Sequence, residues 1–470
     1  MMSKTTRIEH DLLGDREVSN ECYYGVQTLR AKENFNFTGM QVSSTPSMVI
    51  ALAYVKKAAA LTNLELGLLP ADTAQAITQA CDEIIGGKLH DQFVVDVFQG
   101  GAGTSTNMNA NEVIANLALE IMGKDKGDYK FCHPNNHVNC SQSTNDAYPT
   151  AFRIALHFEM KKLMESMDVI QKSFAAKGTE FADILKMGRT QLQDAVPMTL
   201  GQEFAAYATT ISEDIQRVFE AHNLVHEINM GATAIGTGLN APPEYARLVT
   251  QHLRNLTGIP LETSANLVEA TWDTGAYMQI SGVLKRFAIK MSKICSDLRL
   301  LSSGPRAGMN EINLPAMQPG SSIMPGKVNP VIPEVVNQIA YQVAGADIAI
   351  TMASENGQLE LNVMEPVIAY NLFMSINLLD RACTTLATKC VDGITANPDT
   401  CRQMVMNSIG IVTALNPSIG YENSTAVAAE ALEKGLSVYD LVLEKGLLPK
   451  ETLDEILSAE NMMHPKFIAA

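Results

Sequence analysis

The sequence predicts a mainly α-helical fold, because long stretches carry apolar residues at helical spacing. From Phe152 to Phe174 such residues recur every three or four positions, which places them on one face of a long helix. A second stripe runs from Ile280 to Leu301 at alternating intervals of four and three, a near-heptad spacing typical of helix bundles. Polar segments interrupt these helical stretches. We therefore expect a long central helix bundle with only minor β-structure.

The elements can be assigned in chain order. Residues 1–45 mix turn residues with scattered apolar ones and are expected to be irregular. A long helix should begin near Asp146, with a break near residues 177–197. Thr199 and Gln202 have the spacing of a capping box, which predicts another helix start. The other predicted helices cover residues 46–66, 72–85, 280–301, 333–353 and 365–394, and helical periodicity also follows Val113.

Beyond Asn397 the predicted helices shorten and turn signals recur. This change suggests a small C-terminal domain (397–470). The character of the sequence also changes from Asp146 onward, so we divide the rest into an N-terminal domain (1–142) and a central helix-bundle domain (143–396). Several central helices of about 20–30 residues exceed the usual mean of about 11–12. One face of so long a bundle needs a cover, so we expect a homo-oligomer.

Composition limits the possible partners. The 470 residues are 46% hydrophobic and 18% charged, with a net charge of −16 that argues against binding to nucleic acid. No apolar run approaches the roughly 18 residues that span a membrane. The first residues are charged and lack the apolar core of a signal peptide, so we predict a cytoplasmic protein. Eight cysteines in so long a chain are too sparse for a disulfide scaffold.

Candidate binding residues lie in polar segments beside the predicted helices. Helix N-termini provide free N–H groups and the positive end of a dipole, which suit carboxylates. The same hydroxyl and amide groups serve ordinary helix caps, and this alternative stays open. The segments cover residues 103–111, 141–146 and 188–194, and their candidates are Thr104, Ser143, Thr144, Asn145, Thr190 and Gln191.

A further polar segment, residues 320–330, reads G-S-S-I-M-P-G-K-V-N-P. Two glycines and two prolines exclude a regular helix or strand, so this segment is predicted to be a loop. Its polar side chains are donors without an acid: Ser321, Ser322, Lys327 and Asn329. Such a loop suits an anion and can close over it. The alternative is a solvated linker.

Other site templates fail. The loop lacks the spacing and final Ser/Thr of a phosphate-binding loop, and no G-x-G-x-x-G or G-x-S-x-G pattern is present. His133 and His137 could share a metal only if their segment were helical, which the intervening Pro134 and Asn135 disfavour. We therefore predict no cofactor and no metal site.

Together these segments resemble the aspartase/fumarase superfamily of lyases, whose signature G-S-S-x-M-P-x-K-x-N-P matches residues 320–330. The resemblance extends to G-A-G-T-S-T-N-M-N-A-N-E, S-Q-S-T-N-D-A-Y-P-T and G-R-T-Q-L-Q-D-A-V-P. In detail the chain is similar to the aspartase branch. Gln191 stands where fumarases place histidine, so a charged side chain at that position is lost.

The resemblance implies a three-domain, mainly helical subunit whose central helices form the twenty-helix core of a homotetramer, with each active site shared by three subunits. It implies reversible deamination of L-aspartate to fumarate and ammonia, without cofactor, by anti-elimination through an aci-carboxylate intermediate. Ser321 would be the catalytic base. One substrate carboxylate would bind Thr104, Ser143, Thr144 and Ser322, the other Lys327 and Asn329, and the amino group would lie near Asn145, Thr190 and Gln191.

Two alternatives remain at this point. A fumarase-type or other lyase of the superfamily would convert malate or a related substrate. A non-catalytic helical protein that binds dicarboxylates would bind without turnover.

Overall fold

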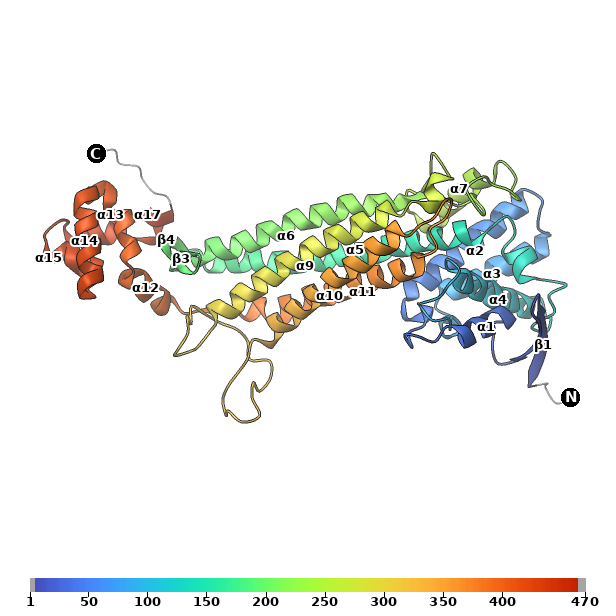
Figure 1. The fold of residues 1–470 in the computed structure, drawn as a ribbon, viewed down its shortest axis with the longest axis horizontal. Helices are drawn as coiled ribbons and strands as arrows, with labels where there is room; N and C mark the ends of the chain where they lie inside the picture. The colour runs from blue at the N-terminus through green and yellow to red at the C-terminus, as the bar shows by residue number, and fades with distance from the viewer. Residues whose placement is uncertain (1–4, 464–470) are drawn as a thin grey trace. The chain divides into compact units, whose positions relative to one another are not determined.

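A computed structural model describes residues 5–463, and helices form most of it (Figure 1). The predicted mainly α fold is confirmed, and the strands in this range pair only as two-stranded sheets. The chain divides into two compact units. Unit 1 comprises residues 1–164, 216–286 and 342–379, and unit 2 comprises 165–215, 287–341 and 380–470.

Long helices contribute residues to both units: α5 (Thr144–Glu180), α9 (Gly275–Leu301), α10 (Val331–Glu355) and α11 (Glu365–Lys389), together with α6 (Leu200–His222). The two apolar stripes predicted for α5 and α9 are confirmed. Every member of the stripe from Ile280 to Leu301 is buried, and so is every member from Phe152 to Phe174. Apolar periodicity therefore located the core faces of both helices.

Aromatic contacts join the helices within unit 1. The Phe152 ring of α5 has its centroid 4.5 Å from that of Tyr277 on α9 and 5.4 Å from that of Phe373 on α11. A polar contact adds α10, because Ser281 donates a hydrogen bond to the Asp347 carboxylate at 2.7 Å. Buried aromatic packing thus stabilises the contacts between these helices within unit 1.

The helices predicted for residues 46–66 and 72–85 are confirmed as α2 (Pro46–Glu65) and α3 (Ala71–Ile85). The expectation that residues 1–45 are irregular was wrong. They contain α1 (Val26–Asn34) and an antiparallel hairpin of β1 (Thr6–Asp11) and β2 (Gly14–Ser19). This hairpin has charged and polar residues on both faces, so it lacks the apolar alternation that identifies a half-buried strand.

The other elements of unit 1 are α4 (Thr104–Ile121), α7 (Tyr245–Thr257), α8 (Glu269–Trp272) and the parallel pair β5 (Glu227–Ile228) and β6 (Glu262–Thr263). Contacts between α2 and α3, α7 and α4 make this part a compact helical layer around buried alanines and leucines.

Unit 2 carries an antiparallel hairpin, β3 (Leu185–Thr190) and β4 (Gln193–Thr199), in the region where a break was expected. The predicted capping box is confirmed: the Gln202 N–H donates to Thr199 Oγ1 at 3.1 Å, and the Thr199 N–H donates to Gln202 Oε1 at 3.0 Å. A long loop leads from α9 to α10 (Figure 1).

The C-terminal helices of unit 2 are short, as predicted: α12 (Pro398–Asn407), α13 (Val412–Ile419), α14 (Tyr421–Lys434), α15 (Val438–Glu444), α16 (Lys450–Ile456) and α17 (Ala459–Met463). The pair β7 (Ile312–Asn313) and β8 (Thr395–Ala396) precedes them. Buried apolar residues of the C-terminal helices form one cluster with Leu185 and Met187 of β3. Among the helices of residues 5–463, none combines the length and apolarity needed to cross a membrane.

Candidate active site

In unit 1, two of the predicted polar segments are the first turns of helices α4 and α5. Gly103 directly precedes α4 with φ +91°, and a Cβ there would lie 2.4 Å from the Tyr148 ring of α5. Only glycine tolerates this close approach at a positive φ. The start of α4, with the exposed Thr104, therefore packs against the first turns of α5.

The segment Ser143–Asn145 opens α5. The Asn107 side chain of α4 donates to Thr144 Oγ1 at 3.3 Å, and the Asn145 amide donates to the Ala234 carbonyl at 2.7 Å. The Ser143 hydroxyl accepts a bond from the Asn145 N–H at 3.3 Å, which is the cap-type contact that the alternative reading expected. Both a cap and a set of neutral donors are thus present at one helix start.

The carboxylate of Asp146 anchors this helix start through hydrogen bonds. Its carboxylate accepts hydrogen bonds from the N–H groups of Ser143, Gly231 and Thr233 at 2.9–3.0 Å. Burial raises its pKa to about 6, although these hydrogen bonds act in the opposite direction. The side chain ties the start of α5 to the turn after β5.

A buried lysine forms hydrogen bonds with residues next to the start of α5. Lys56 of α2 donates to the side-chain oxygens of Asn107 (2.6 Å), Gln142 (2.8 Å) and Asn139 (3.0 Å). Burial lowers its pKa to about 7, while the negative charge of Asp146 raises it. Lys56 is thus a positioning residue for Asn107, which in turn contacts Thr144. It was not identified from the sequence.

In unit 2, Thr190 ends β3 and Gln191 forms the exposed tip of the hairpin with φ +55°. Neighbouring ion pairs anchor this hairpin. The buried carboxylate of Glu311 lies 2.6 Å from Arg189 and 3.1 Å from Lys186. The segment is a strand turn anchored by ion pairs, and β4 leads from it directly into α6 at Leu200, so it precedes a helix as expected.

Hydrogen bonds join the two ends of the loop 320–330 in unit 2, and we call this closure the neck of the loop. The Gly320 N–H donates to the Lys327 carbonyl at 2.7 Å, and the Asn329 amide donates to the Gly320 carbonyl at 2.6 Å. Pro319 and Val328 form a β-bridge at the same place. A Cβ on Gly320 would lie 2.5 Å from the Lys327 carbonyl oxygen, so the neck requires glycine.

Within this loop, two backbone N–H groups converge on the Ser321 hydroxyl. Ile323 and Met324 donate to its oxygen at 3.2 and 3.0 Å. Donors in this arrangement stabilise negative charge on the oxygen. Ser322 and Lys327 are exposed, and the Ile323 side chain is 84% exposed.

The ten candidate residues therefore fall into two groups. Unit 1 holds Thr104, Ser143, Thr144 and Asn145; unit 2 holds Thr190, Gln191, Ser321, Ser322, Lys327 and Asn329. Neither unit holds all ten.

The expectation about His133 and His137 needs a correction. Residues Pro134–Val138 form one π-helical turn, although proline and asparagine were expected to prevent a helix there. The turn begins at Pro134, where a missing N–H costs nothing. His137 Nδ1 accepts the His133 N–H at 2.8 Å, and His133 Nδ1 accepts the Asn135 N–H at 3.0 Å. Both rings thus serve the turn itself.

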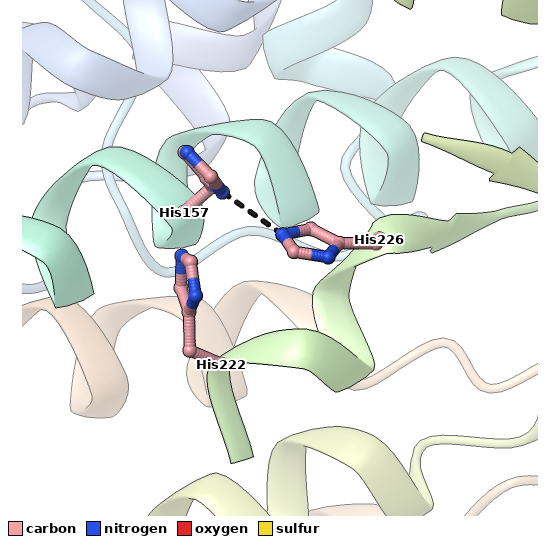
Figure 2. Close-up of side chains that lie close together, drawn as sticks. All are labelled: His157, His222 and His226. Carbon is pink, nitrogen blue, oxygen red and sulfur yellow. Dashed lines mark hydrogen bonds between the residues drawn. The ribbon is translucent and has the colours of Figure 1, made fainter. Parts of the chain in front are cut away.

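The sequence did not reveal a cluster of three other histidines in unit 1. His157 of α5 lies beside His222 and His226, with ligand-type atoms within 4.8 Å of one another (Figure 2). His222 and His226 are four positions apart, which is a usable signal. His157 lies 69 positions from His226, so no local spacing could include it.

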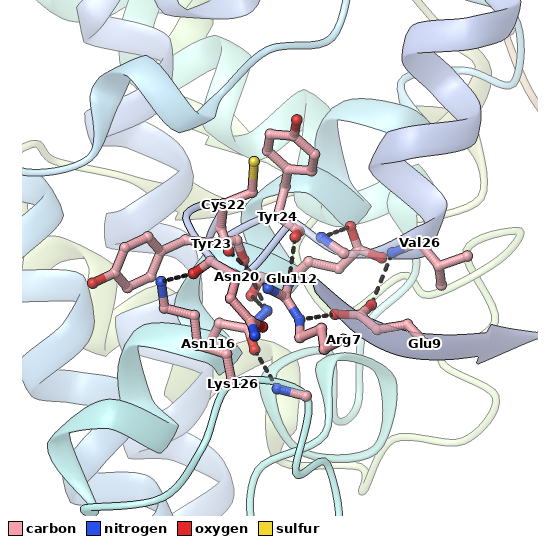
Figure 3. Close-up of polar contacts among 12 residues, drawn as sticks. Arg7, Glu9, Asn20, Cys22, Tyr23, Tyr24, Val26, Glu112, Asn116 and Lys126 are labelled. Atoms are coloured by element: carbon pink, nitrogen blue, oxygen red, sulfur yellow. Dashed lines mark hydrogen bonds and ion pairs between the residues drawn. The ribbon is translucent and has the colours of Figure 1, made fainter. Parts of the chain in front are cut away.

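A second buried polar cluster holds the N-terminal segment on α4 (Figure 3). The Glu112 carboxylate accepts bonds from the N–H groups of Gly25 (2.8 Å) and Gln27 (2.9 Å) and from the Thr28 hydroxyl (2.6 Å). Glu9 accepts the Val26 N–H at 2.8 Å. Burial raises the pKa of Glu112 to about 7. These bonds cap α1, which is a structural role.

Comparison with known proteins adds sequence and fold evidence. The lyase family matches residues 14–345, and the fumarase C C-terminus family matches residues 411–464. The chain is 61% identical to an aspartate ammonia-lyase of Helicobacter pylori over 98% of both chains. It is 56% identical to an aspartate ammonia-lyase of Escherichia coli, over 100% of this chain and 98% of the relative.

Solved structures share the fold. The crystal structure of fumarate lyase:delta crystallin from Brucella melitensis bound to cobalt has a TM-score of 0.96 and 54% identity, covering 98% of this chain and 100% of that one. The class II fumarase of Schistosoma mansoni has a TM-score of 0.91 and 34% identity, with 98% and 99% covered. With the signature loop, these matches lead to one conclusion: the chain belongs to the aspartase/fumarase superfamily of lyases.

Proposed function

We propose that this chain is an aspartate ammonia-lyase, a carbon–nitrogen lyase that interconverts L-aspartate with fumarate and ammonia. The observation that carries the proposal is the 56–61% identity to aspartate ammonia-lyases over nearly the whole chain. We place the enzyme in the cytoplasm, as the sequence predicted.

The reaction removes a proton from the carbon beside the side-chain carboxylate. The electron pair left behind makes a doubly charged aci-carboxylate, and the carbon–nitrogen bond then breaks so that the amino group leaves as ammonia. We assign proton removal to Ser321. A serine hydroxyl is a poor base unless its alkoxide is stabilised, and the N–H groups of Ile323 and Met324 that already point at its oxygen support this assignment.

The two substrate carboxylates need preorganised donors, because the doubly charged intermediate forms too rarely in water unless donors already point to where its charge develops. We assign the carboxylate that gains charge to Thr104, Ser143, Thr144 and Ser322, and the positive end of the α5 helix dipole lies beside Ser143 and Thr144. We assign the other carboxylate to Lys327 and Asn329. One N–H of the Asn329 amide is bonded to Gly320, which leaves its second N–H for substrate.

The amino group is assigned to Asn145, Thr190 and Gln191. Gln191 is neutral at every pH, so this pocket recognises the amine through hydrogen bonds. The exposed position of Gln191 at the tip of a charge-anchored hairpin supports the assignment, because a tip can enter a site formed with another chain.

We propose a homotetramer in which each site draws on three subunits. One face of α10 supports self-association, because its exposed side chains include Tyr341 (62%), Ile348 (63%) and Met352 (67%). A row of exposed apolar side chains on one helix face is what we expect of a surface that another subunit covers. The division of the candidates between two units agrees with shared sites, and the three-domain division at 142/143 and 396/397 is part of this proposal.

The experiment is an ultraviolet assay of the unsaturated diacid formed from aspartate, malate and argininosuccinate by the purified protein. We expect turnover of aspartate alone. Turnover of malate instead would identify a fumarase-type enzyme, and binding of dicarboxylates without any turnover would identify the non-catalytic alternative. Argininosuccinate reports on other lyases of the superfamily.

A further inference from the structure

We propose that His157, His222 and His226 form a binding site for one divalent transition-metal ion of the Zn²⁺ or Co²⁺ class. The site belongs to unit 1 and involves none of the ten candidate active-site residues.

The first support is the convergence of the rings. His157 Nδ1 lies 3.1 Å from His226 Nε2, and the ring centroids of His157 and His222 lie 4.4 Å apart. Two nitrogens that bind one tetrahedral Zn²⁺ at about 2.0–2.1 Å lie about 3.3–3.4 Å from each other. The His157–His226 pair is thus already close to the ligand separation, and Figure 2 shows the His222 ring directed toward the same place.

The second support is the unsatisfied state of His222. Its side chain is 6% exposed, and neither ring nitrogen has a hydrogen-bond partner in the part of the chain that the structure describes. A buried imidazole without a partner carries a free-energy cost. Binding of a metal ion by one of its nitrogens would remove that cost.

The ligand set determines which ions fit. Three neutral imidazoles with no carboxylate among them suit Zn²⁺, Co²⁺ or Ni²⁺, whereas Mg²⁺ prefers oxygen ligands. Three protein ligands leave a further coordination position, which water fills. His157 and His226 are half-buried, so an ion can reach the site.

The site would connect two segments of unit 1 that are distant in sequence. His157 lies on α5, His222 is the last residue of α6, and His226 ends the short 3-10 helix that follows. A bound ion would therefore stabilise the turn after α6 against α5, and an ion that binds only the folded state raises the melting temperature.

The test uses the full-length assembled enzyme after treatment with a chelator. Titration with Co²⁺ should give one ion per subunit and the visible absorption of a low-symmetry, nitrogen-bound Co²⁺ complex. Zn²⁺ should raise the apparent melting temperature by several degrees, and Mg²⁺ should leave it unchanged. These readouts do not depend on turnover, so they stand or fall separately from the proposed lyase activity.

Variants decide the assignment. His222→Ala and His226→Ala should each weaken Co²⁺ binding by more than the about 10–100-fold that loss of an outer-shell partner causes. His10→Ala and His252→Ala, which alter histidines outside the cluster, are the matched controls and should bind like the parent. Circular dichroism checks that each variant keeps its helical structure. If His222→Ala does not fold, His226→Ala, at a half-buried position, decides the test. Stoichiometric binding that survives the His226 change, or binding only at millimolar Co²⁺, would overturn the proposal.

Discussion

Replacement of the buried Lys56 by methionine tests whether the network behind the starts of α4 and α5 positions Thr144. Methionine keeps most of the apolar stem but removes all three hydrogen bonds from Nζ. Asn139 Oδ1 keeps two donors, the amides of Asn107 and Asn111, both at 3.1 Å. The oxygens of Asn107 and Gln142 lose the donor that Lys56 supplies.

Each buried acceptor left without a partner costs about 1–3 kcal/mol. Removal of a buried ammonium offsets part of this cost, and Gln142 is half-buried and can regain water. We therefore expect Lys56→Met to lose about 2–4 kcal/mol of unfolding free energy. Turnover should fall as well, because Asn107 would no longer be fixed against Thr144.

The control is Lys57→Met at the next position. Lys57 pairs with the exposed Asp82 at 2.5 Å, and such surface pairs contribute about 0–1 kcal/mol. Urea unfolding and aspartate kinetics of the parent and both variants provide the measurement. Equal stability of the two variants would refute the reasoning, because the network would then carry no more weight than a surface ion pair.

The pH dependence of this comparison has a definite sign. Burial lowers the folded-state pKa of Lys56 from 10.5 to about 7, so the unfolded chain binds more protons between these values. The stability of the parent should therefore rise with pH across this window, while Lys56→Met lacks this contribution. The stability gap between the two proteins should widen from pH 7 upward.

Three further changes test other parts of the account. Gly103→Ala forces a Cβ to 2.4 Å from Tyr148 and should lower both turnover and melting temperature. Gly123→Ala also places a Cβ at a positive φ (+68°, against +91° at Gly103), but in open space, so it should lose only about 1–2 kcal/mol; equal losses would argue against the close approach. Asn329→Asp places a carboxylate against the Gly320 carbonyl and against the substrate carboxylate, which it repels. KM should therefore rise at least about tenfold with little change in melting temperature; an unchanged KM would remove Asn329 from the site. Burial raises the pKa of Glu365 from 4.5 to about 8, so its contribution to stability is lost as pH rises through that window. Glu365→Gln should therefore gain melting temperature relative to the parent as pH rises from 4.5 to about 8; a constant difference would refute the shift.

The sequence predicted those parts of the fold that depend on local periodicity. The buried stripes of α5 and α9 and the Thr199–Gln202 capping box follow from spacing alone. The β1–β2 hairpin escaped prediction because charged residues occupy both of its faces. Strand pairing of that kind is stabilised by contacts such as Arg7 with the Ser19 carbonyl, which no local pattern encodes.

The site residues divide in the same way. The loop 320–330 was visible in sequence because its glycines, prolines and donors are contiguous. Lys56 was not, because a lone lysine in an apolar helix shows no sign of the three amide oxygens around it. Such groups meet only through tertiary packing.

The most direct test of the central claim is turnover of L-aspartate by Ser321→Ala, measured as the ultraviolet absorbance of fumarate in protein whose oligomeric state and helicity match those of the parent. If the ionised Ser321 hydroxyl takes the proton, kcat should fall by about 10²–10⁴-fold. A kcat within tenfold of the parent would show that another group removes the proton.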